Sequence, residues 1–214
     1  MPRKTLEEKI RQYHEMSRFE NGLREEGYRL IAGVDEVGRG PLAGPVMAGA
    51  VILPPDTELV IAGVDDSKKL TPLRRAALFE EIKEKAIAWA VGVVDVETID
   101  RINILQATKK AMRQAVESLA PQAEALLIDA VRLEEILLPQ RSIIKGDGAS
   151  VSIAAASIVA KETRDQWMRQ MDEVYPQYGF ASNKGYGSAK HIEALRKYGP
   201  CPLHRRTFIG HFVG

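Results

Sequence analysis

The sequence predicts an α/β protein with a mixed five-stranded sheet flanked by helices and a helical C-terminal segment. Five short apolar runs have the length of buried strands, and segments with helical periodicity separate or follow them. The first three runs lack long crossovers, which favours antiparallel pairing, whereas the strands beyond the central helix are expected to pair in parallel. Three of the strands carry an acid near one end, so these ends can converge at one crevice.

Length and composition indicate one globular domain with an appendage. The chain has 214 residues, of which 45% are hydrophobic and 28% charged, and this is enough for one sizeable core. We expect an N-terminal helical extension over residues 1–27 and a main domain over residues 28–214 that includes the helical C-terminal segment. The single cysteine, Cys201, excludes an internal disulfide framework and cannot form a zinc cluster alone.

Membrane and export signals are not found in the sequence. No apolar stretch approaches the roughly 18 residues that span a bilayer. Residues 1–16 lack the apolar region of a signal peptide. We therefore expect a cytoplasmic protein, monomeric and without membrane contact.

The N-terminal part of the chain predicts one helix and two strands. Residues 5–26 are strongly charged, with apolar residues at irregular helical spacing, which is typical of an amphipathic helix packed outside the core. Residues 30–34 form the first apolar run, and residues 45–53 form the second, which Pro54 and Pro55 end.

The next segment predicts a helix and a third strand. A Thr-Pro start signal precedes residues 73–86, whose periodicity indicates a helix with Leu73 and Ile82 on its buried face. Residues 89–96 form the third apolar run, in which Gly92 is a candidate β-bulge.

The second half of the chain alternates helices with short strands. Small and apolar residues line one face of residues 103–119, with Asn103 as the expected N-cap. The following elements are strands over residues 125–130 and 141–145, a long helix over 150–175, and a short helix over 189–199 before a basic tail. The small residues in the first half of the long helix would let it lie tightly against the sheet.

Four acids near strand ends form the candidate metal site: Asp35, Glu36, Asp129 and Asp147. Buried carboxylates are unfavourable unless something pairs with them. Oxygen ligands without His or Cys suit Mg²⁺ or Mn²⁺ rather than zinc, and two such ions about 4 Å apart can support phosphodiester hydrolysis. Taken alone, a strand-end aspartate is more often a turn former than a ligand. Asp165, inside the long helix, is interpreted as a local ion pair with the preceding arginine or as a cap.

The loop Gly38-Arg39-Gly40 follows the first two acids directly. Glycines on both sides of the arginine allow the backbone to approach an anionic ligand closely. The loop is a poor dinucleotide fingerprint, because Pro41 and Pro45 block the helix that should begin there. A nucleotide-dependent oxidoreductase is therefore disfavoured.

Seven stretches resemble the signature of bacterial ribonuclease HII, in order and at matching spacing, over residues 30–208. They are GVDEVGRGPLAGPV, DDSKKL, NILQAT, LLIDA, KGDGASVSIAAASIVAKETRD, NKGYGSAKH and HRRTF. The resemblance implies a ribonuclease H-like fold and hydrolysis of RNA within RNA–DNA hybrids. It also implies cutting on the 5′ side of ribonucleotides embedded in duplex DNA, which leaves 3′-hydroxyl and 5′-phosphate ends.

The family's functional residues carry over to matching positions. The four acids of the candidate site match the family's four metal-binding acids. Gly38, Arg39 and Gly40 match the loop that reads the ribose 2′-hydroxyl at the RNA–DNA junction, and Tyr186 matches the tyrosine that contacts the same sugar. Lys68 is an expected phosphate contact. A 2′-hydroxyl both donates and accepts hydrogen bonds, so a close backbone and a phenol can distinguish ribose from deoxyribose.

A non-catalytic hybrid-binding protein on the same fold is the remaining alternative. Such a protein would lack one or more of the acids, and all four are present. The charge distribution is compatible with either function. Residues from 141 onward carry a net charge of +5 and the first 140 residues −4, which is compatible with a phosphate backbone as partner of the C-terminal third. Taken alone this signal is weak, and a solvated mixed surface is the better explanation of it.

Overall fold

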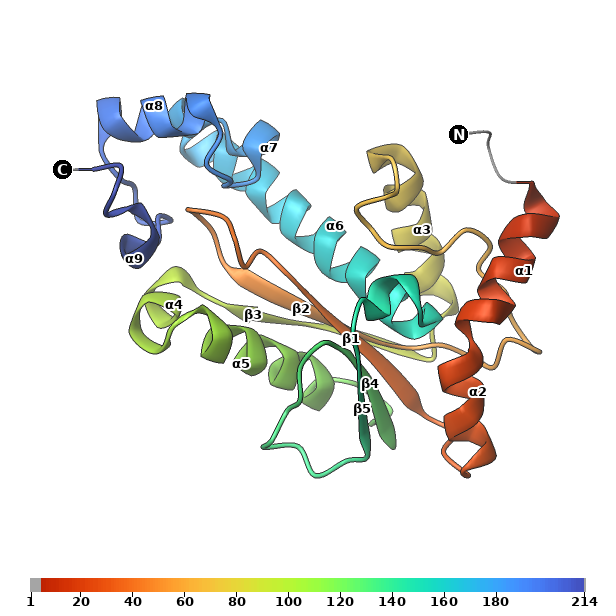
Figure 1. Ribbon diagram of the computed structural model, residues 1–214. Coiled ribbons are helices and arrows are strands. Elements are labelled where there is room, and N and C mark those ends of the chain that lie inside the picture. The colour runs from red at the N-terminus through yellow and green to blue at the C-terminus, as the bar shows by residue number, and fades with distance from the viewer. Residues whose placement is uncertain (1–4, 214) are drawn as a thin grey trace.

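A computed structural model describes residues 5–213 and shows one five-stranded sheet between two groups of helices (Figure 1). The first four residues of the predicted N-terminal extension and the last residue of the predicted main domain lie outside the described residues. The strands are β1 (Ile31–Val37), β2 (Val46–Ile52), β3 (Ala88–Val94), β4 (Ala125–Asp129) and β5 (Gln140–Ile143). Their order in the sheet is β3-β2-β1-β4-β5.

The sheet is mixed, as the sequence predicted. β1 pairs antiparallel with β2, and β2 with β3. β4 pairs in parallel with both β1 and β5. The carboxyl ends of β1, β4 and β5 therefore meet at one edge of the sheet, which is the edge where the acidic residues were expected.

Helices cover both faces of the sheet. They are α1 (Leu6–Met16), α2 (Arg18–Glu25), α3 (Pro72–Lys85), α4 (Val96–Ile102), α5 (Ile104–Glu117), α6 (Val151–Val174), α7 (Phe180–Asn183), α8 (Ala189–Tyr198) and α9 (Arg206–Ile209). Two short 3₁₀ turns, η1 (Gly146–Gly148) and η2 (Pro176–Tyr178), flank α6. α5 packs on one face, α6 and α3 on the other, and the C-terminal helices gather at the far end of α6 (Figure 1). None of the described helices is long and apolar enough to cross a membrane.

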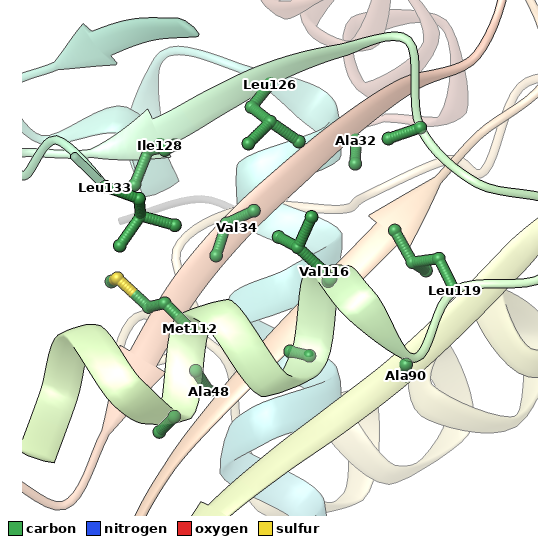
Figure 2. Packing of buried hydrophobic residues seen from close by; sticks show 14 of the residues in the cluster. Ala32, Val34, Ala48, Ala90, Met112, Val116, Leu119, Leu126, Ile128 and Leu133 are labelled. Atoms are coloured by element: carbon green, nitrogen blue, oxygen red, sulfur yellow. The ribbon is translucent and has the colours of Figure 1, made fainter. Parts of the chain in front are cut away.

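The face under α5 holds the larger apolar cluster. Figure 2 shows Met112 and Val116 of α5 beside Val34 of β1 and Leu126 and Ile128 of β4. All five side chains are buried. Burial of this kind is the main favourable term in folding, at about 25 cal/mol per Å² of apolar surface.

α6 lies unusually close to the other face of the sheet. A Cβ atom on Gly33 would lie 2.0 Å from the backbone carbon of Ser152, and one on Gly49 would lie 2.4 Å from the Ala156 carbonyl oxygen. The two glycines and the small residues of α6 together permit this approach, which agrees with the expected tight packing of the long helix.

Gly92 is not a β-bulge, because the β2–β3 register continues through it, with Gly92 opposite Ala48. A Cβ atom there would lie 1.9 Å from the Ala111 carbonyl oxygen. The glycine instead admits the backbone of α5 to the sheet.

The predicted N-terminal helix is two helices that pack partly into the core. α1 ends at Met16 and α2 begins at Arg18. Tyr13 and Met16 are buried with α3 and α6, and Leu23 with β1 and β4. The expectation that this segment packs outside the core was therefore wrong, whereas the domain division at residue 27 stays a prediction.

Two further details of the sequence prediction were wrong. Leu73 is 84% exposed, because α3 turns Leu78 and Ile82 toward the core instead. The third strand ends at Val94, and the following Asp95 caps α4, a helix that was not predicted.

Candidate active site

Three acids converge at the carboxyl ends of the two central parallel strands. Asp35 and Glu36 lie near the end of β1, and Asp129 ends β4, one residue beyond the Val34–Ile128 pair of the register. Oxygen atoms from these three carboxylates all lie within 4.8 Å of one another. Successive strand residues point to opposite faces, yet Asp35 and Glu36 both reach this cluster.

The fourth predicted acid, Asp147, lies in η1, just after β5. It is outside the three-residue cluster of carboxylates. The backbone N–H of Gly146 donates to Asp129 Oδ1 at 2.7 Å, and this bond holds η1 against the end of β4. Asp147 is close enough to Asp129 for the two charges to interact.

The cluster carries more negative charge than its surroundings balance. Burial raises the pKa of Asp35 well above its ordinary value, and the charges of Glu36 and Asp129 raise it further. Burial also raises the pKa of Glu36, although Arg39, whose Nη1 lies 3.5 Å from Glu36 Oε1, opposes this effect. Crowded carboxylates of this kind, all oxygen donors, are a fitting ligand set for a hard divalent cation.

Asp147 also has more negative than positive charge around it. Burial raises its pKa, and the neighbouring Asp66 and Asp129 add to the rise. Lys68 Nζ lies 3.8 Å from Asp147 Oδ2 and acts in the opposite direction. Desolvation lowers the pKa of Lys68, but the charges of Asp147, Asp35 and other nearby acids outweigh it, so the net shift is upward. Lys68 is therefore a firmly charged ammonium group beside the acids.

A cleft of about 270 Å³ brings the predicted substrate residues together next to the acids. Its lining includes Gly38, Arg39, Gly40, Lys68 and Tyr186, all of which were expected to contact substrate. The Tyr186 residue is 47% exposed. The cleft thus joins residues that lie up to about 150 positions apart in the chain, as one substrate surface requires.

Four residues of the site were not predicted: Ser67, Ser157 and Lys161, which line this cleft, and Asp66, which acts on Asp147. Asp66 lies close enough to Asp147 for its charge to raise the pKa of that carboxyl. Ser67 and Ser157 hydroxyls lie 2.8 Å apart, and Ser157 also hydrogen-bonds to Asp35. Lys161 lines the cleft one turn of α6 beyond Ser157. The DDSKKL stretch contained the signal for Asp66 and Ser67, since they are the two residues before Lys68.

Asp165 lies in a different environment. Its carboxylate pairs with Lys161 at 2.6 Å and with Arg75 at 3.4 Å, and Arg75 also pairs with Glu162 at 2.6 Å. The ion-pair interpretation fits these contacts, but the expected partner was wrong, because Arg164 binds backbone carbonyl oxygens instead.

A second cavity, of about 330 Å³, lies against α5 and contains none of the predicted site residues. Its basic side chains Lys109 and Arg113 already pair with Glu134 and Glu135. The acids and the substrate residues therefore favour the first cleft as the active site.

Comparisons with known proteins identify the family of the chain. The family model described as Ribonuclease HII matches residues 32–211. Ribonuclease HII of Acetivibrio thermocellus is 55% identical over 207 residues, which cover 97% of this chain and 80% of that protein. Ribonuclease HII of Geobacter sulfurreducens is 58% identical over 192 residues, which cover 90% of this chain and 88% of that protein.

Solved structures show the same likeness. The structure of RNase HII of Archaeoglobus fulgidus in its complex with PCNA aligns with a TM-score of 0.71 at 28% identity, covering 83% of this chain and 94% of that one. The predicted fold and the family resemblance are confirmed: the chain belongs to the ribonuclease HII family of nucleases.

Proposed function

We propose that the protein is an endoribonuclease that hydrolyses RNA in RNA–DNA hybrids and cuts 5′ of ribonucleotides embedded in duplex DNA. The observation that carries the proposal is the cluster of Asp35, Glu36 and Asp129, whose oxygen atoms lie within 4.8 Å beside the cleft. The proposed substrates are RNA–DNA hybrids and ribonucleotide-containing duplex DNA, and the proposed products have 3′-hydroxyl and 5′-phosphate ends.

The acids would hold two Mg²⁺ or Mn²⁺ ions. When bound, such ions activate a water and stabilise the leaving oxygen of the phosphodiester. Asp35, Glu36 and Asp129 are the proposed ligands, and Asp147 is the fourth catalytic acid. The ammonium group of Lys68, beside Asp147, would contact a phosphate of the substrate.

The loop and the tyrosine would recognise the sugar. Gly38, Arg39 and Gly40 present backbone to the cleft, and Tyr186 adds an exposed phenol. Within residues 5–213 no acceptor is recorded for the N–H groups of Arg39 and Gly40. These two donors are available to the 2′-hydroxyl oxygen of a ribonucleotide.

We further propose that the protein acts as a cytoplasmic monomer in DNA replication and repair. Removing ribonucleotides from duplex DNA is the step that this activity would supply there. Gel filtration coupled to light scattering would test the monomer, with a dimer mass as the contrary result.

Cleavage of a labelled DNA duplex with one embedded ribonucleotide tests the function directly. The enzyme should cut once, 5′ of the ribonucleotide, in Mg²⁺ or Mn²⁺ and not in a chelator. Extension of the upstream product by a polymerase and ligation of the downstream product would identify the 3′-hydroxyl and 5′-phosphate ends.

An otherwise identical all-DNA duplex is the control. Equal cleavage of both duplexes would contradict the proposed specificity. Tight binding of the ribonucleotide duplex without cleavage in either metal would favour the non-catalytic alternative.

A further inference from the structure

Arg205 is a fully buried cation whose hydrogen bonds within residues 5–213 all go to backbone oxygens, while its guanidinium lies 5.1 Å from the centre of the Phe208 ring. Its guanidinium donates to the carbonyl oxygens of Gly38 at 2.5 Å, Arg39 at 2.9 Å and Gly44 at 2.8 and 3.0 Å. Among the described residues no carboxylate forms an ion pair with Arg205. The nearby Asp100 instead accepts hydrogen bonds from the N–H groups of Arg206 and Thr207. Burial lowers the pKa of Arg205 to about 9, so the group stays charged at neutral pH.

These bonds fix the direction of two peptide units in the sugar-reading loop. In a trans peptide unit the C=O and N–H groups point in opposite directions. Because Arg205 holds the carbonyl oxygens of Gly38 and Arg39, the N–H groups of Arg39 and Gly40 must point away from it. Neither of these N–H groups has an acceptor among residues 5–213, and both residues line the cleft.

His204, the residue before Arg205, is linked to the other sugar-reading element. His204 Nε2 lies 3.0 Å from His191 Nε2, and His191 Nδ1 lies 2.8 Å from the Tyr186 carbonyl oxygen. A carbonyl can only accept, so His191 carries its proton on Nδ1 and His204 donates from Nε2. The Cys201 N–H then donates to His204 Nδ1 at 3.0 Å, which completes one consistent chain of bonds.

Burial disfavours the charged form of both histidines, in agreement with this chain of bonds. Burial lowers the pKa of His204 to about 4, with His191 adding to the effect, and burial also lowers the pKa of His191. His204 packs against the ring of Tyr178, with 4.8 Å between ring centroids. Its backbone also forms an isolated β-bridge with Ala43, three residues after Gly40. Arg205 therefore contacts the 38–40 loop directly, and its neighbour His204 reaches Tyr186 through His191.

We propose that His204 and Arg205 are positioning residues that set the 38–40 loop and Tyr186 in the geometry needed to read a ribose 2′-hydroxyl. The inference rests on the proposed function. An apolar side chain could fill the space of Arg205, but only a planar guanidinium has the fork of donors that binds three carbonyls at once. Lysine would keep the charge and lose the fork.

The test compares two substrates that differ only at the 2′ position. Single-turnover rates are measured on a duplex with one embedded ribonucleotide and on the same duplex with a 2′-fluoro nucleotide, whose fluorine is a poor hydrogen-bond acceptor and cannot donate. Arg205→Lys should reduce the preference for the ribonucleotide by about tenfold, the size expected when one hydrogen bond is lost. Its affinity for the all-DNA duplex should stay near that of wild type.

Arg206→Lys is the matched control, because Arg206 is the exposed neighbour of Arg205 and receives the same substitution. It should keep the wild-type preference. A purely structural role for Arg205 would lower both rates equally and leave their ratio unchanged, and that result would overturn the proposal.

His204→Phe decides the case if Arg205→Lys does not fold. Phenylalanine keeps a ring against Tyr178 and removes Nε2, which links His204 through His191 to Tyr186, together with Nδ1, which accepts from Cys201. A reduced 2′-hydroxyl preference supports the positioning role, and an unchanged preference overturns it. Wild-type enzyme that fails to cut the ribonucleotide duplex would overturn the proposed function itself, which is a separate outcome.

Discussion

Asp147 and Asp165 are both buried aspartates in the last third of the chain, and their surroundings predict different roles. Asp147 faces other acids and only the exposed Lys68, whereas Asp165 pairs with Lys161 and Arg75. Asp147→Asn should therefore abolish nearly all cleavage with little loss of stability. Asp165→Asn should leave much more activity but lower the melting temperature, because a buried ion pair loses one partner.

Single-turnover cleavage and thermal unfolding of the two variants measure this contrast. Wild-type protein purified in parallel is the reference for both. A larger activity loss in Asp165→Asn than in Asp147→Asn would show that the fourth acid was wrongly assigned.

Tyr186 lies between two glycines at the edge of the cleft, half exposed, so its ring contributes little to the core. The proposed role is packing of the ring on the sugar and a hydrogen bond from the hydroxyl. Tyr186→Ala should lose about 1–3 kcal/mol of stacking, and Tyr186→Phe only about 0.5–1.5 kcal/mol from the hydroxyl. Cleavage of a single embedded ribonucleotide should fall much further in the alanine variant.

Thermal stability should change little in either tyrosine variant, and its measurement separates substrate contact from folding. Near-native cleavage by both variants would show that this loop does not read the junction.

The candidate site residues identified from sequence were those in compact motifs. Asp35, Glu36 and the glycine loop are contiguous, and a strand followed by glycine signals a functional turn. Asp66 and Lys161 escaped because their roles depend on which residues the fold places opposite them. Arg205 escaped for the same reason, since nothing in the local sequence shows that it is buried among carbonyl oxygens.

At the scale of elements, α2 supports the start of α6 through one buried acid. Glu20 is 1% exposed and accepts hydrogen bonds from the Ser150 hydroxyl at 2.5 Å and the Ser152 N–H at 2.9 Å. The first N–H groups of a helix lack partners within the helix, and a carboxylate there is favourable. Glu20 Oε2, however, has no hydrogen-bond partner among residues 5–213.

Burial raises the pKa of Glu20, although its bonds to Ser150 and Ser152 oppose the rise. The folded protein therefore binds the carboxyl proton of Glu20 more tightly than the unfolded chain does. This difference stabilises the folded protein fully below the pKa that Glu20 has in the unfolded chain. The stabilisation is lost as the pH rises through the pKa that Glu20 has in the folded protein. Each unit of elevation is worth about 1.4 kcal/mol.

Glu20→Gln removes this titration and keeps an oxygen that can accept both bonds. The stability of the variant relative to wild type should therefore increase as the pH rises from about 4 to 8. Denaturant unfolding at a series of pH values measures the difference, with Glu25→Gln on the exposed side of α2 as the matched control. If the stability of Glu20→Gln relative to wild type stays constant or falls as the pH rises, the proposed burial of a charged Glu20 is contradicted.

The strands and the long helices were predicted from local patterns, and the errors lie where tertiary contacts decide. Asn103 was predicted as an N-cap, and its side chain does accept from Leu105 and Gln106. α4 was missed because the apolar run of β3 continues into its first residue. The buried positions of Tyr13 and Glu20 could not be seen in a charged segment, because they depend on how α1 and α2 dock against α3 and α6.

At the scale of the whole molecule, the acid cluster should weaken the fold when no metal is bound. Asp129 contributes to the raised pKa of Asp35, Glu36 and Asp147, which means that these charges repel one another. Asp129→Asn removes one charge and keeps an Oδ1 that can accept from the Gly146 N–H. In a chelator this variant should be more stable than wild type, by on the order of 1 kcal/mol, and should still bind RNA–DNA hybrid.

Divalent ions should reverse the order of stability of wild type and Asp129→Asn. A ligand that binds only the folded state at 100 times its dissociation constant adds about 2.7 kcal/mol of stability. Titration with Mg²⁺ should therefore raise the melting temperature of wild type well above that of Asp129→Asn, whose hydrolysis should be nearly absent. Asp165→Asn is the control, because it should lose stability in the chelator and still gain from Mg²⁺. Equal Mg²⁺-induced shifts in wild type and Asp129→Asn, together with near wild-type cleavage by the variant, would show that Asp129 is not a metal ligand.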